Sequence, residues 1–220
     1  MTPVSPAKGP PQRVTLEGRY VRLEPLGPQH VAGLYRAATT ADGQERFDYL
    51  FEYAPQDEAE MARFVQAAAA RTDPLMWAVV DRATGTAEGR QALMRIVPEH
   101  GVIEIGSVYW GPNMARSRLA TEALFLHARY VFDELGYRRF EWKCNNFNEP
   151  SKRAAQRFGF AFEGIFRQHM IQKGLNRDTA WFAILDGDWP RLRAEYQRWL
   201  GPENFDGEGR QKSRLICLLP

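Results

Sequence analysis

The chain has 220 residues, of which 44% are hydrophobic and 25% charged, and its formal net charge is +2. This length is typical of one large domain, and a chain of this size buries about 70% of its unfolded surface without a metal or disulfide. Cys144 and Cys217 form no CxxC motif, which argues against a disulfide scaffold or a zinc site. No apolar run approaches the roughly 18 residues of a membrane span. We therefore expect a cytoplasmic protein without membrane contacts, whose net charge is too small for a general nucleic-acid binder.

The charge is distributed unevenly along the chain. Residues 116–177 contain twelve Lys and Arg against six Asp and Glu, a balance of +6, so the remaining residues carry 2 − 6 = −4. This asymmetry indicates that the second half of the chain meets an anion. The alternative is that several of these arginines lie on solvated helix faces.

Hydrophobic spacing and turn residues divide the chain into elements. Four prolines without apolar periodicity predict a disordered tail over residues 1–12. A single domain is expected over 13–200, followed by a C-terminal extension over 201–220. The period of two predicts strands at 19–25, 76–80, 89–97, 102–110, 137–144, 160–172 and 177–185. Apolar residues three and four apart predict helices after Pro28, around 61–68, and at 117–135, 149–158 and 189–200. This order predicts the α+β class with a mixed sheet.

The connection after Trp110 carries the first sign of a binding site. Gly111 and Pro112 end a strand, and a short loop with Arg116 and Arg118 leads directly into a helix. The free N–H groups and the dipole of a helix N-terminus favour an anion, and arginines suit phosphate oxygens. We therefore predict a phosphate or pyrophosphate site here. An ordinary strand–helix connection with solvated arginines is the alternative.

Several short motifs follow one another from this loop onward. They are 119–124 (LATEAL), 133–139 (DELGYRR), 145–151 (NNFNEPS), 157–160 (RFGF) and 163–167 (EGIFR). Together they resemble the GNAT superfamily of N-acetyltransferases, in particular its ribosomal-protein-alanine N-acetyltransferase branch, over about Trp110 to Arg167. The resemblance implies a mixed, mostly antiparallel sheet of about seven strands, flanked by helices. It also implies that the strands at 102–110 and 137–144 splay apart to hold acetyl-CoA as co-substrate, without a metal.

The phosphate loop of this family normally has the form Q/R-x-x-G-x-G/A and corresponds to residues 115–120. Both glycines are absent here, and Arg116 and Arg118 stand in their positions. Glycine allows close approach to phosphate or a positive φ. The loop therefore either cradles phosphate in ordinary helical geometry with help from the guanidinium groups, which we favour, or has lost acetyl-CoA. The cofactor-binding residues implied by the resemblance are Val108, Tyr109, Trp110, Arg116, Ser117, Arg118, Leu119, Ala120, Thr121, Asn148 and Ser151.

The resemblance assigns roles to Asn148 and Ser151. In the family the asparagine bonds the pantetheine amide, and the serine three residues later lies near the CoA sulfur. Asn148 or Glu149 would cap the short helix, which places Ser151 in its first turn facing the splayed strands. A hydroxyl there can supply a proton or hydrogen bond to the leaving thiolate. The alternative is that Asn148 is only a cap and Ser151 only a polar first-turn residue.

A general base is also needed, because an amine is protonated at neutral pH. Glu104 lies among apolar neighbours on a strand of the predicted opening, and an apolar setting raises a carboxyl pKa. The period of two predicts that Glu104 shares a face with Gly106 and Val108. Asp48 and Glu163 are rival bases, and an exposed polar position is the alternative for Glu104.

Four aromatic residues alternate within 47–53. In the fold that the resemblance implies, this segment covers the acceptor side of the cleft. The alternatives for it are a wall of the acceptor pocket or plain core packing. The residues are Phe47, Tyr49, Phe51 and Tyr53.

We therefore predict an acyl-CoA-dependent N-acetyltransferase that moves an acetyl group to a primary amine by direct attack in a ternary complex. Ser151 and Glu104 are the expected catalytic residues. The expected partner is a small-molecule or protein N-terminal amine, with neither nucleic acid nor membrane, and we also consider a homodimer. The alternative is a catalytically degenerate CoA-binding or regulatory module of the same fold. A nucleic-acid-binding domain is disfavoured, because the arginines flank a phosphate loop and do not interleave with aromatic residues.

Overall fold

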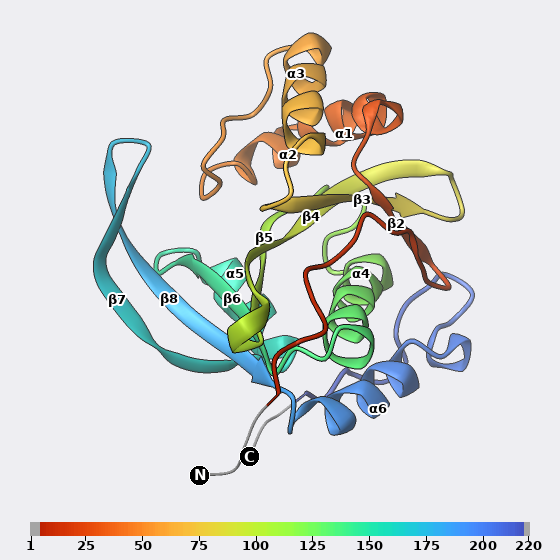
Figure 1. Cartoon of the computed structure of the whole chain (residues 1–220). Helices are drawn as coiled ribbons and strands as arrows, with labels where there is room; N and C mark the ends of the chain where they lie inside the picture. Colours follow the sequence, from red (N-terminus) through yellow and green to blue (C-terminus); the bar gives the residue numbers. More distant parts are fainter. Residues whose placement is uncertain (1–4, 218–220) are drawn as a thin grey trace.

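A single mixed sheet runs through the molecule and is covered by helices on both faces (Figure 1). The computed structural model describes residues 5–217. Within them the strand order is β1-β2-β3-β4-β5-β6-β8-β7, and neighbours are antiparallel except for the parallel pair β5 and β6. The strands are β1 Leu16–Glu17, β2 Val21–Pro25, β3 Leu75–Asp81, β4 Thr86–Val97, β5 Val102–Trp110, β6 Arg139–Asn145, β7 Ala161–Gln172 and β8 Leu175–Leu185. The α+β class is as predicted, and the eighth strand of the described residues is the two-residue β1.

The helices form two layers, one on each face of the sheet (Figure 1). Apolar residues of α1 and α3 pack with β3 and β4 in one core, and α4 and α6 pack with β5, β6 and β8 in the other. A π-helical turn, 130–134, continues α4. The helices are α1 Val31–Ala38, α2 Ala41–Glu45, α3 Glu58–Ala69, α4 Arg118–Arg129, α5 Glu149–Arg157 and α6 Trp189–Trp199.

A buried carboxylate ties the first turns of α4 to the beginning of the sheet. Glu122 accepts hydrogen bonds from the backbone N–H groups of Arg19, Tyr20 and Val21 at 2.8, 2.5 and 2.7 Å. Each of these donors would cost about 1–3 kcal/mol if it were left buried without an acceptor. The position of the α4 N-terminus relative to β2 is therefore strongly determined.

The parallel strands β5 and β6 separate after four paired residues. Pairing joins 102–105 to 139–142 and then stops. On the other side of β5, Ala92 faces Gly106 and Arg90 faces Tyr109, so β5 contains one extra residue, and Ser107 takes a φ of +47°. An extra residue of this kind is a β-bulge, which bends its strand. The predicted opening between these two strands is therefore present.

The bulge also changes which side chains of β5 share a face. Before it, Glu104 and Gly106 lie on one face and Ile105 on the other, in the α4 core. After it, Val108 packs against the same core as Ile105, and the Tyr109 side chain belongs to the α1 core. The predicted common face of Glu104, Gly106 and Val108 is therefore wrong at Val108, because the period of two assumes a strand without an extra residue.

Both terminal segments within the described residues are attached to the domain. Ala7 and Lys8 donate backbone hydrogen bonds of 2.9 Å to the carbonyls of Pro98 and Leu135. Residues 5–12 thus differ from the predicted disordered tail, because loop carbonyls that the tail's own composition does not reveal accept its N–H groups. Residues 1–4 and 218–220 lie outside the described residues. The C-terminal segment buries apolar side chains in the core of α6, namely Phe205, Leu215 and Cys217.

Candidate active site

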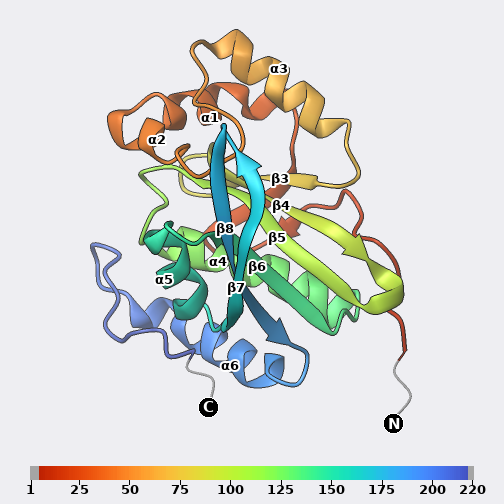
Figure 2. The same cartoon turned by 90° about the vertical axis from the view of Figure 1, so that its left-hand side faces the viewer.

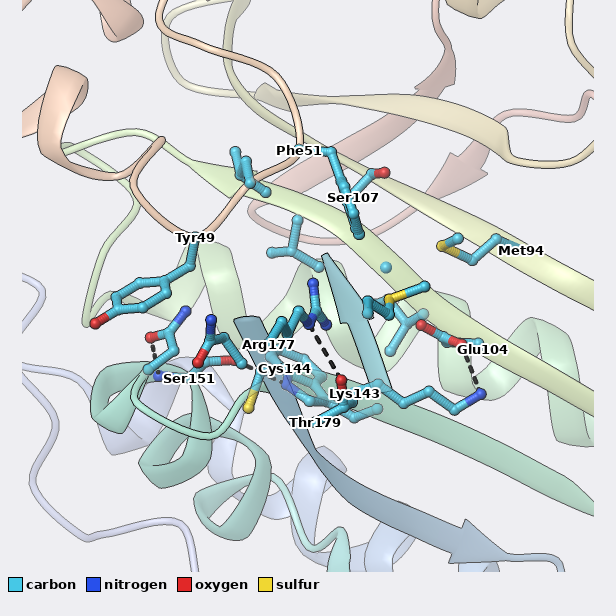
Figure 3. Close-up of a pocket in the computed structure, with 18 of the residues that line it drawn as sticks. Tyr49, Phe51, Met94, Glu104, Ser107, Lys143, Cys144, Ser151, Arg177 and Thr179 are labelled. Atoms are coloured by element: carbon cyan, nitrogen blue, oxygen red, sulfur yellow. Dashed lines mark hydrogen bonds and ion pairs between the residues drawn. The ribbon is translucent and has the colours of Figure 1, made fainter. Parts of the chain in front are cut away.

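A pocket lies where β5 and β6 separate (Figure 3). Its floor comes from β5, β6 and β8, and the connection between α2 and α3 forms one wall. Two of the predicted catalytic or binding side chains, Ser151 and Asn148, reach it from the start of α5. The lining residues used below are Tyr49, Phe51, Met94, Arg95, Glu104, Ser107, Val108, Trp142, Lys143, Cys144, Asn148, Ser151, His169, Met170, Arg177 and Thr179.

The connection between α2 and α3 is held over the pocket from two sides. The Tyr49 hydroxyl donates to the Phe147 carbonyl at 3.2 Å, next to α5. From the β7–β8 hairpin, the Gln172 amide donates to the Tyr49 carbonyl at 2.9 Å and Lys173 Nζ to the Phe47 carbonyl at 2.8 Å. This hairpin lies beside the connection (Figure 2), and its residues His169, Met170 and Arg177 line the pocket.

The four alternating aromatic residues of this connection have different environments. Tyr49 and Phe51 line the pocket, as the acceptor-wall hypothesis requires. Phe47 packs in the core, with its ring centroid 4.7 Å from that of Tyr109. Tyr53 is 71% exposed and lies under the Lys173 ammonium. Pocket lining and core packing are therefore divided among these residues, because 47–53 is not a strand, and a role of Tyr49 and Phe51 in binding the acceptor stays a prediction.

The start of α5 has the predicted capping arrangement. Asn148 Oδ1 accepts from the Ser151 backbone N–H at 3.0 Å, so Asn148 is the N-cap and Ser151 lies in the first turn. The Trp142 indole N–H donates to Ser151 Oγ at 3.0 Å. The hydroxyl keeps its own proton for donation, and Cys144 is one neighbour: burial raises the pKa of the Cys144 thiol, and a hydrogen bond with Ser151 opposes this rise.

Glu104 is buried in the pocket floor, but its surroundings are not apolar. It is only 4% exposed, and its carboxylate lies 2.9 Å from Lys143 Nζ and 3.3 Å from Arg95 Nη1. Burial raises the pKa of Glu104, and the two cations oppose this rise. The expectation of few polar neighbours is therefore wrong, because it considered only neighbours in sequence, and both cations come from adjacent strands.

The rival bases lie elsewhere, and a histidine that sequence reasoning did not weigh lies in the pocket. Asp48 is exposed outside the pocket lining, and Glu163 pairs with Arg139 on the face of β6 and β7. His169 lines the pocket, with Nδ1 3.0 Å from Thr179 Oγ1. Burial and nearby cations lower the pKa of His169, which keeps the imidazole neutral at neutral pH. Its place in the pocket follows from the order of strands β6, β8 and β7, which no local pattern reveals.

The loop before α4 takes the backbone conformation that its missing glycine would supply. Arg116 has a φ of +59°. Ser117 is the N-cap of α4, and its Oγ accepts from the Leu119 N–H at 3.1 Å. Among residues 5–217, the backbone N–H groups of Arg116, Arg118 and Ala120 have no hydrogen-bond acceptor. The predicted ordinary helical geometry is therefore wrong at Arg116, while the free N–H groups suited to phosphate are present.

The side chains of this loop divide between solvent and core. The Arg118 guanidinium packs over the Tyr20 ring at 4.3 Å from the ring centroid, and also contacts Phe205. Arg116 is exposed at the loop. The side chains of Leu119, Ala120 and Thr121 pack toward the core or are buried. Of the two arginines, Arg116 is therefore the cation that is free to approach a phosphate, and Arg118 acts in packing.

The predicted strand residues contribute backbone more than side chains. The Tyr109 hydroxyl donates to the Ala37 carbonyl at 2.8 Å, on the face away from the opening. The Trp110 indole donates to Gln91 at 3.0 Å and packs edge-on against Trp142. Because β6 pairs with β5 only as far as residue 105, the β6-facing backbone edge of 106–110 remains available. An extended amide-containing chain such as pantetheine fits such an edge.

Comparison with known proteins agrees with this geometry. A family model described as the acetyltransferase (GNAT) domain matches residues 21–161. The crystal structure of a GCN5-related N-acetyltransferase from Brucella melitensis is 57% identical, covers 96% of both chains and has a TM-score of 0.93. That of a probable GNAT-family acetyltransferase from Chromobacterium violaceum ATCC 12472 is 37% identical over 86% of this chain and 98% of that chain, with a TM-score of 0.77.

Among curated proteins, the uncharacterized N-acetyltransferase YoaA of Bacillus subtilis (strain 168) is 30% identical over 111 residues, which is 50% of this chain and 62% of YoaA. The match thus spans less than two thirds of that relative. The chain belongs to the GNAT acetyltransferase family, as the family model establishes. The predicted superfamily is confirmed, and the ribosomal-protein branch stays a resemblance.

Among the helices of the described residues, none is both long and apolar enough to cross a membrane. No group of three or more His, Cys, Asp or Glu side chains in residues 5–217 could hold a metal ion. Cys144 and Cys217 are both buried and unpaired.

Arg116→Gly tests the role of the loop cation. Glycine adopts a φ near +59° without strain, so this variant removes the charge and keeps the backbone. We expect it to weaken acetyl-CoA binding about two- to fivefold in calorimetric titration, as for one exposed ion pair. Arg116→Val should weaken binding further, because a β-branched residue is strained at positive φ. Arg116→Lys, which keeps the charge, should bind acetyl-CoA like the parent protein. Tighter acetyl-CoA binding by Arg116→Gly would contradict the idea that the Arg116 cation makes up for the absent glycine.

Proposed function

We propose that this protein is an enzyme that transfers an acetyl group from acetyl-CoA to a primary amine by direct attack in a ternary complex. One observation carries the proposal: Glu104 and Ser151 line the same pocket, at the point where β5 and β6 separate. A base and a proton donor at one opening are what amine acetylation requires. The family assignment supports the reaction class.

Acetyl-CoA would enter along the opening from the α4 side. The free N–H groups before and within the first turn of α4, together with Arg116, would hold the pyrophosphate. The unpaired edge of β5 and the Asn148 amide would hold the pantetheine arm, which places the thioester in the pocket. These residues fit the co-substrate, because the loop has the required φ at Arg116 and β5 has a free edge.

The reaction requires two protons to move. The ammonium group first loses one proton, which frees the nitrogen lone pair to form the bond to the acetyl carbon, and it loses a second proton as the carbon–sulfur bond breaks. Glu104 would accept one and pass it to solvent, and the other proton would balance the thiolate, which becomes the thiol of CoA. Ser151 would donate a hydrogen bond or its proton to the sulfur, and in the second case it would regain a proton from the second one that the amine releases; its oxygen already accepts from Trp142.

The acceptor would be a small-molecule or protein N-terminal amine, bound on the side of Tyr49 and Phe51. A catalytically degenerate CoA-binding module is the competing proposal, motivated by the absence of both loop glycines. The positive φ of Arg116 makes the absence of glycine a weaker argument for this module, because the loop keeps a conformation that glycine would otherwise provide. Acetyl-CoA binding without acetylation of any amine would favour the degenerate module.

Ser151→Ala tests the proton donor. An interaction made mainly with the leaving sulfur acts in the transition state, so kcat should fall about tenfold or more while acetyl-CoA affinity stays nearly unchanged. Asn148→Ala should instead raise the KM for acetyl-CoA. Steady-state rates and calorimetric Kd values for both variants separate the two roles. Lost affinity with kcat intact in Ser151→Ala would make Ser151 a binding or helix-start residue only.

The pH dependence of kcat/KM tests the general base. A base must be deprotonated, so activity should fall as the pH drops through the raised pKa of Glu104. This fall of kcat/KM at low pH should be absent in Glu104→Gln. The change of kcat/KM at higher pH that reports the ionisation of the amine substrate should remain in every variant. His169→Gln is the matched comparison from the same pocket. If the fall of kcat/KM at low pH is lost in His169→Gln and kept in Glu104→Gln, the general base is His169 and not Glu104.

A further inference from the structure

A buried arginine on β8 points into the pocket. Arg177 is 7% exposed, and its guanidinium is drawn among the pocket side chains, hydrogen-bonded to Thr179 (Figure 3). Alternate residues of β8 face the same side, and the pairing of Lys143 with Trp181 places this side on the pocket face of β6. Arg177 therefore lies on the same face as the buried Lys143.

The hydrogen bonds of Arg177 are made to neutral groups. Its Nε donates to Thr179 Oγ1 at 3.2 Å and its Nη1 to Gln172 Oε1 at 3.1 Å. Within the described residues, Arg177 Nη2 donates no hydrogen bond, and no carboxylate oxygen lies within 4.0 Å of the guanidinium. One edge of the guanidinium is thus left without a partner.

Other buried cations near the pocket have carboxylate partners. Lys143 Nζ lies 2.9 Å from Glu104 and 2.6 Å from Glu141, and Arg90 pairs with Glu52. Arg177 differs from both. A buried charge without a partner is costly, so its retention at a ligand-accessible position indicates a counter-ion that arrives with a ligand.

The nearby acidic and thiol groups do not supply this counter-ion. The Glu104 carboxylate is shared between Lys143 and Arg95. Burial raises the pKa of the Cys144 thiol, which keeps it protonated at neutral pH. Arg95 and Arg46 also line the pocket and add positive charge. The field at Arg177 therefore favours an anion in the pocket.

Apolar side chains surround this cation. The Phe51 ring lies under the guanidinium, with its centroid 5.2 Å away, and Met94 and Met170 line the same pocket. A ligand that fits both features has an anionic group and an apolar body.

On the basis of the proposed function, we propose that the acceptor amine carries a carboxylate that binds the free edge of Arg177, with an apolar body against Phe51. An α-amino acid with an aromatic or thioether side chain has this chemistry. A peptide N-terminus followed by an acidic residue presents the same carboxylate from another source. Guanidinium binds carboxylate through two parallel hydrogen bonds, which gives orientation as well as affinity.

Acceptors that differ only in the carboxylate test this proposal. Phenylalanine is compared with phenylalaninamide, methionine with methioninamide, and the dipeptide amide Ala-Asp with Ala-Asn, by release of the CoA thiol. In the parent protein, the kcat/KM of the carboxylate acceptor should exceed that of its amide partner by about 10- to 100-fold, either for the amino acids or for the dipeptide, which is the range of hydrogen bonds to a charged group. This ratio should collapse toward one in Arg177→Gln and be partly kept in Arg177→Lys. Arg63→Gln, an exposed change on α3, should keep the parent ratio.

The free amino acids and the dipeptides distinguish the two sources of the carboxylate. A preference among amino acids alone assigns the α-carboxylate, and one among dipeptides alone assigns a side chain of a peptide acceptor. Equal rates for every carboxylate and amide pair in the parent protein would overturn the inference while leaving the acetyltransferase proposal intact. An equal fall for both members of a pair in Arg177→Gln would also overturn it, because a structural role would explain that result.

A binding measurement keeps the inference separate from the proposed function. With CoA present and no acetyl donor, phenylalanine or Ala-Asp should raise the Tm of the parent protein, and its amide partner should not. This shift should be lost in Arg177→Gln, compared with the Tm of the same variant without ligand, because glutamine keeps a hydrogen-bonding group beside Thr179 and Gln172 but carries no charge. Such binding without acetylation of any amine would refute the proposed function and support this inference. No carboxylate-dependent shift in the parent protein, with no preference in the rates, would refute the inference.

Discussion

The separation of β5 from β6 is the structural constraint on which the rest of the candidate site depends. Two parallel strands would normally continue their hydrogen-bond ladder, and here the ladder ends after four residues. The extra residue at Ser107 bends β5, and it lies beside the point of separation. The result is a free backbone edge on one strand, with α5 placed at the end of the other. Ser151, Asn148 and Glu104 line one pocket because of this opening.

Two buried carboxylates support this opening in different ways. Glu122 satisfies three backbone donors of β2 and its preceding turn, and thereby holds the N-terminal part of α4 in place. Glu104, in the pocket floor, is paired with Arg95 of β4 and Lys143 of β6. Burial without partners would neutralise such groups, whereas these partners keep a charged network beneath the pocket. The buried cations of this network have carboxylate partners, and Arg177 differs from them because it has none.

Most of the fold could be predicted from local patterns, and the site only in part. The strand at 102–110 and the capped helix at Asn148 follow from spacing and capping chemistry, which act between neighbours in sequence. The partners of Glu104 could not be predicted, since Lys143 and Arg95 arrive through sheet order. The roles of Arg116 and Arg118 could not be separated either, because the stacking of Arg118 on Tyr20 joins segments about a hundred residues apart. His169 and Arg177 carry no local signal, and only the β7–β8 hairpin brings them to the pocket.

The bulge at Ser107 shows where the period of two no longer predicts which face of a strand a side chain takes. A single extra residue in β5 moved Val108 to the opposite face from Glu104. Such irregularities occur near active sites, where they redirect side chains or end strand pairing. A departure from the regular strand is therefore itself informative about function.

Amide hydrogen exchange with and without acetyl-CoA tests the central claim most directly. The N–H groups of Arg116, Arg118 and Ala120 have no recorded protein acceptor within the described residues, so they should exchange rapidly in the free protein. Acetyl-CoA should slow exchange in this loop and along residues 106–110 of β5, because both would become hydrogen-bonded to it. Unchanged exchange in both segments at saturating acetyl-CoA, or protection confined to other strands, would contradict the account.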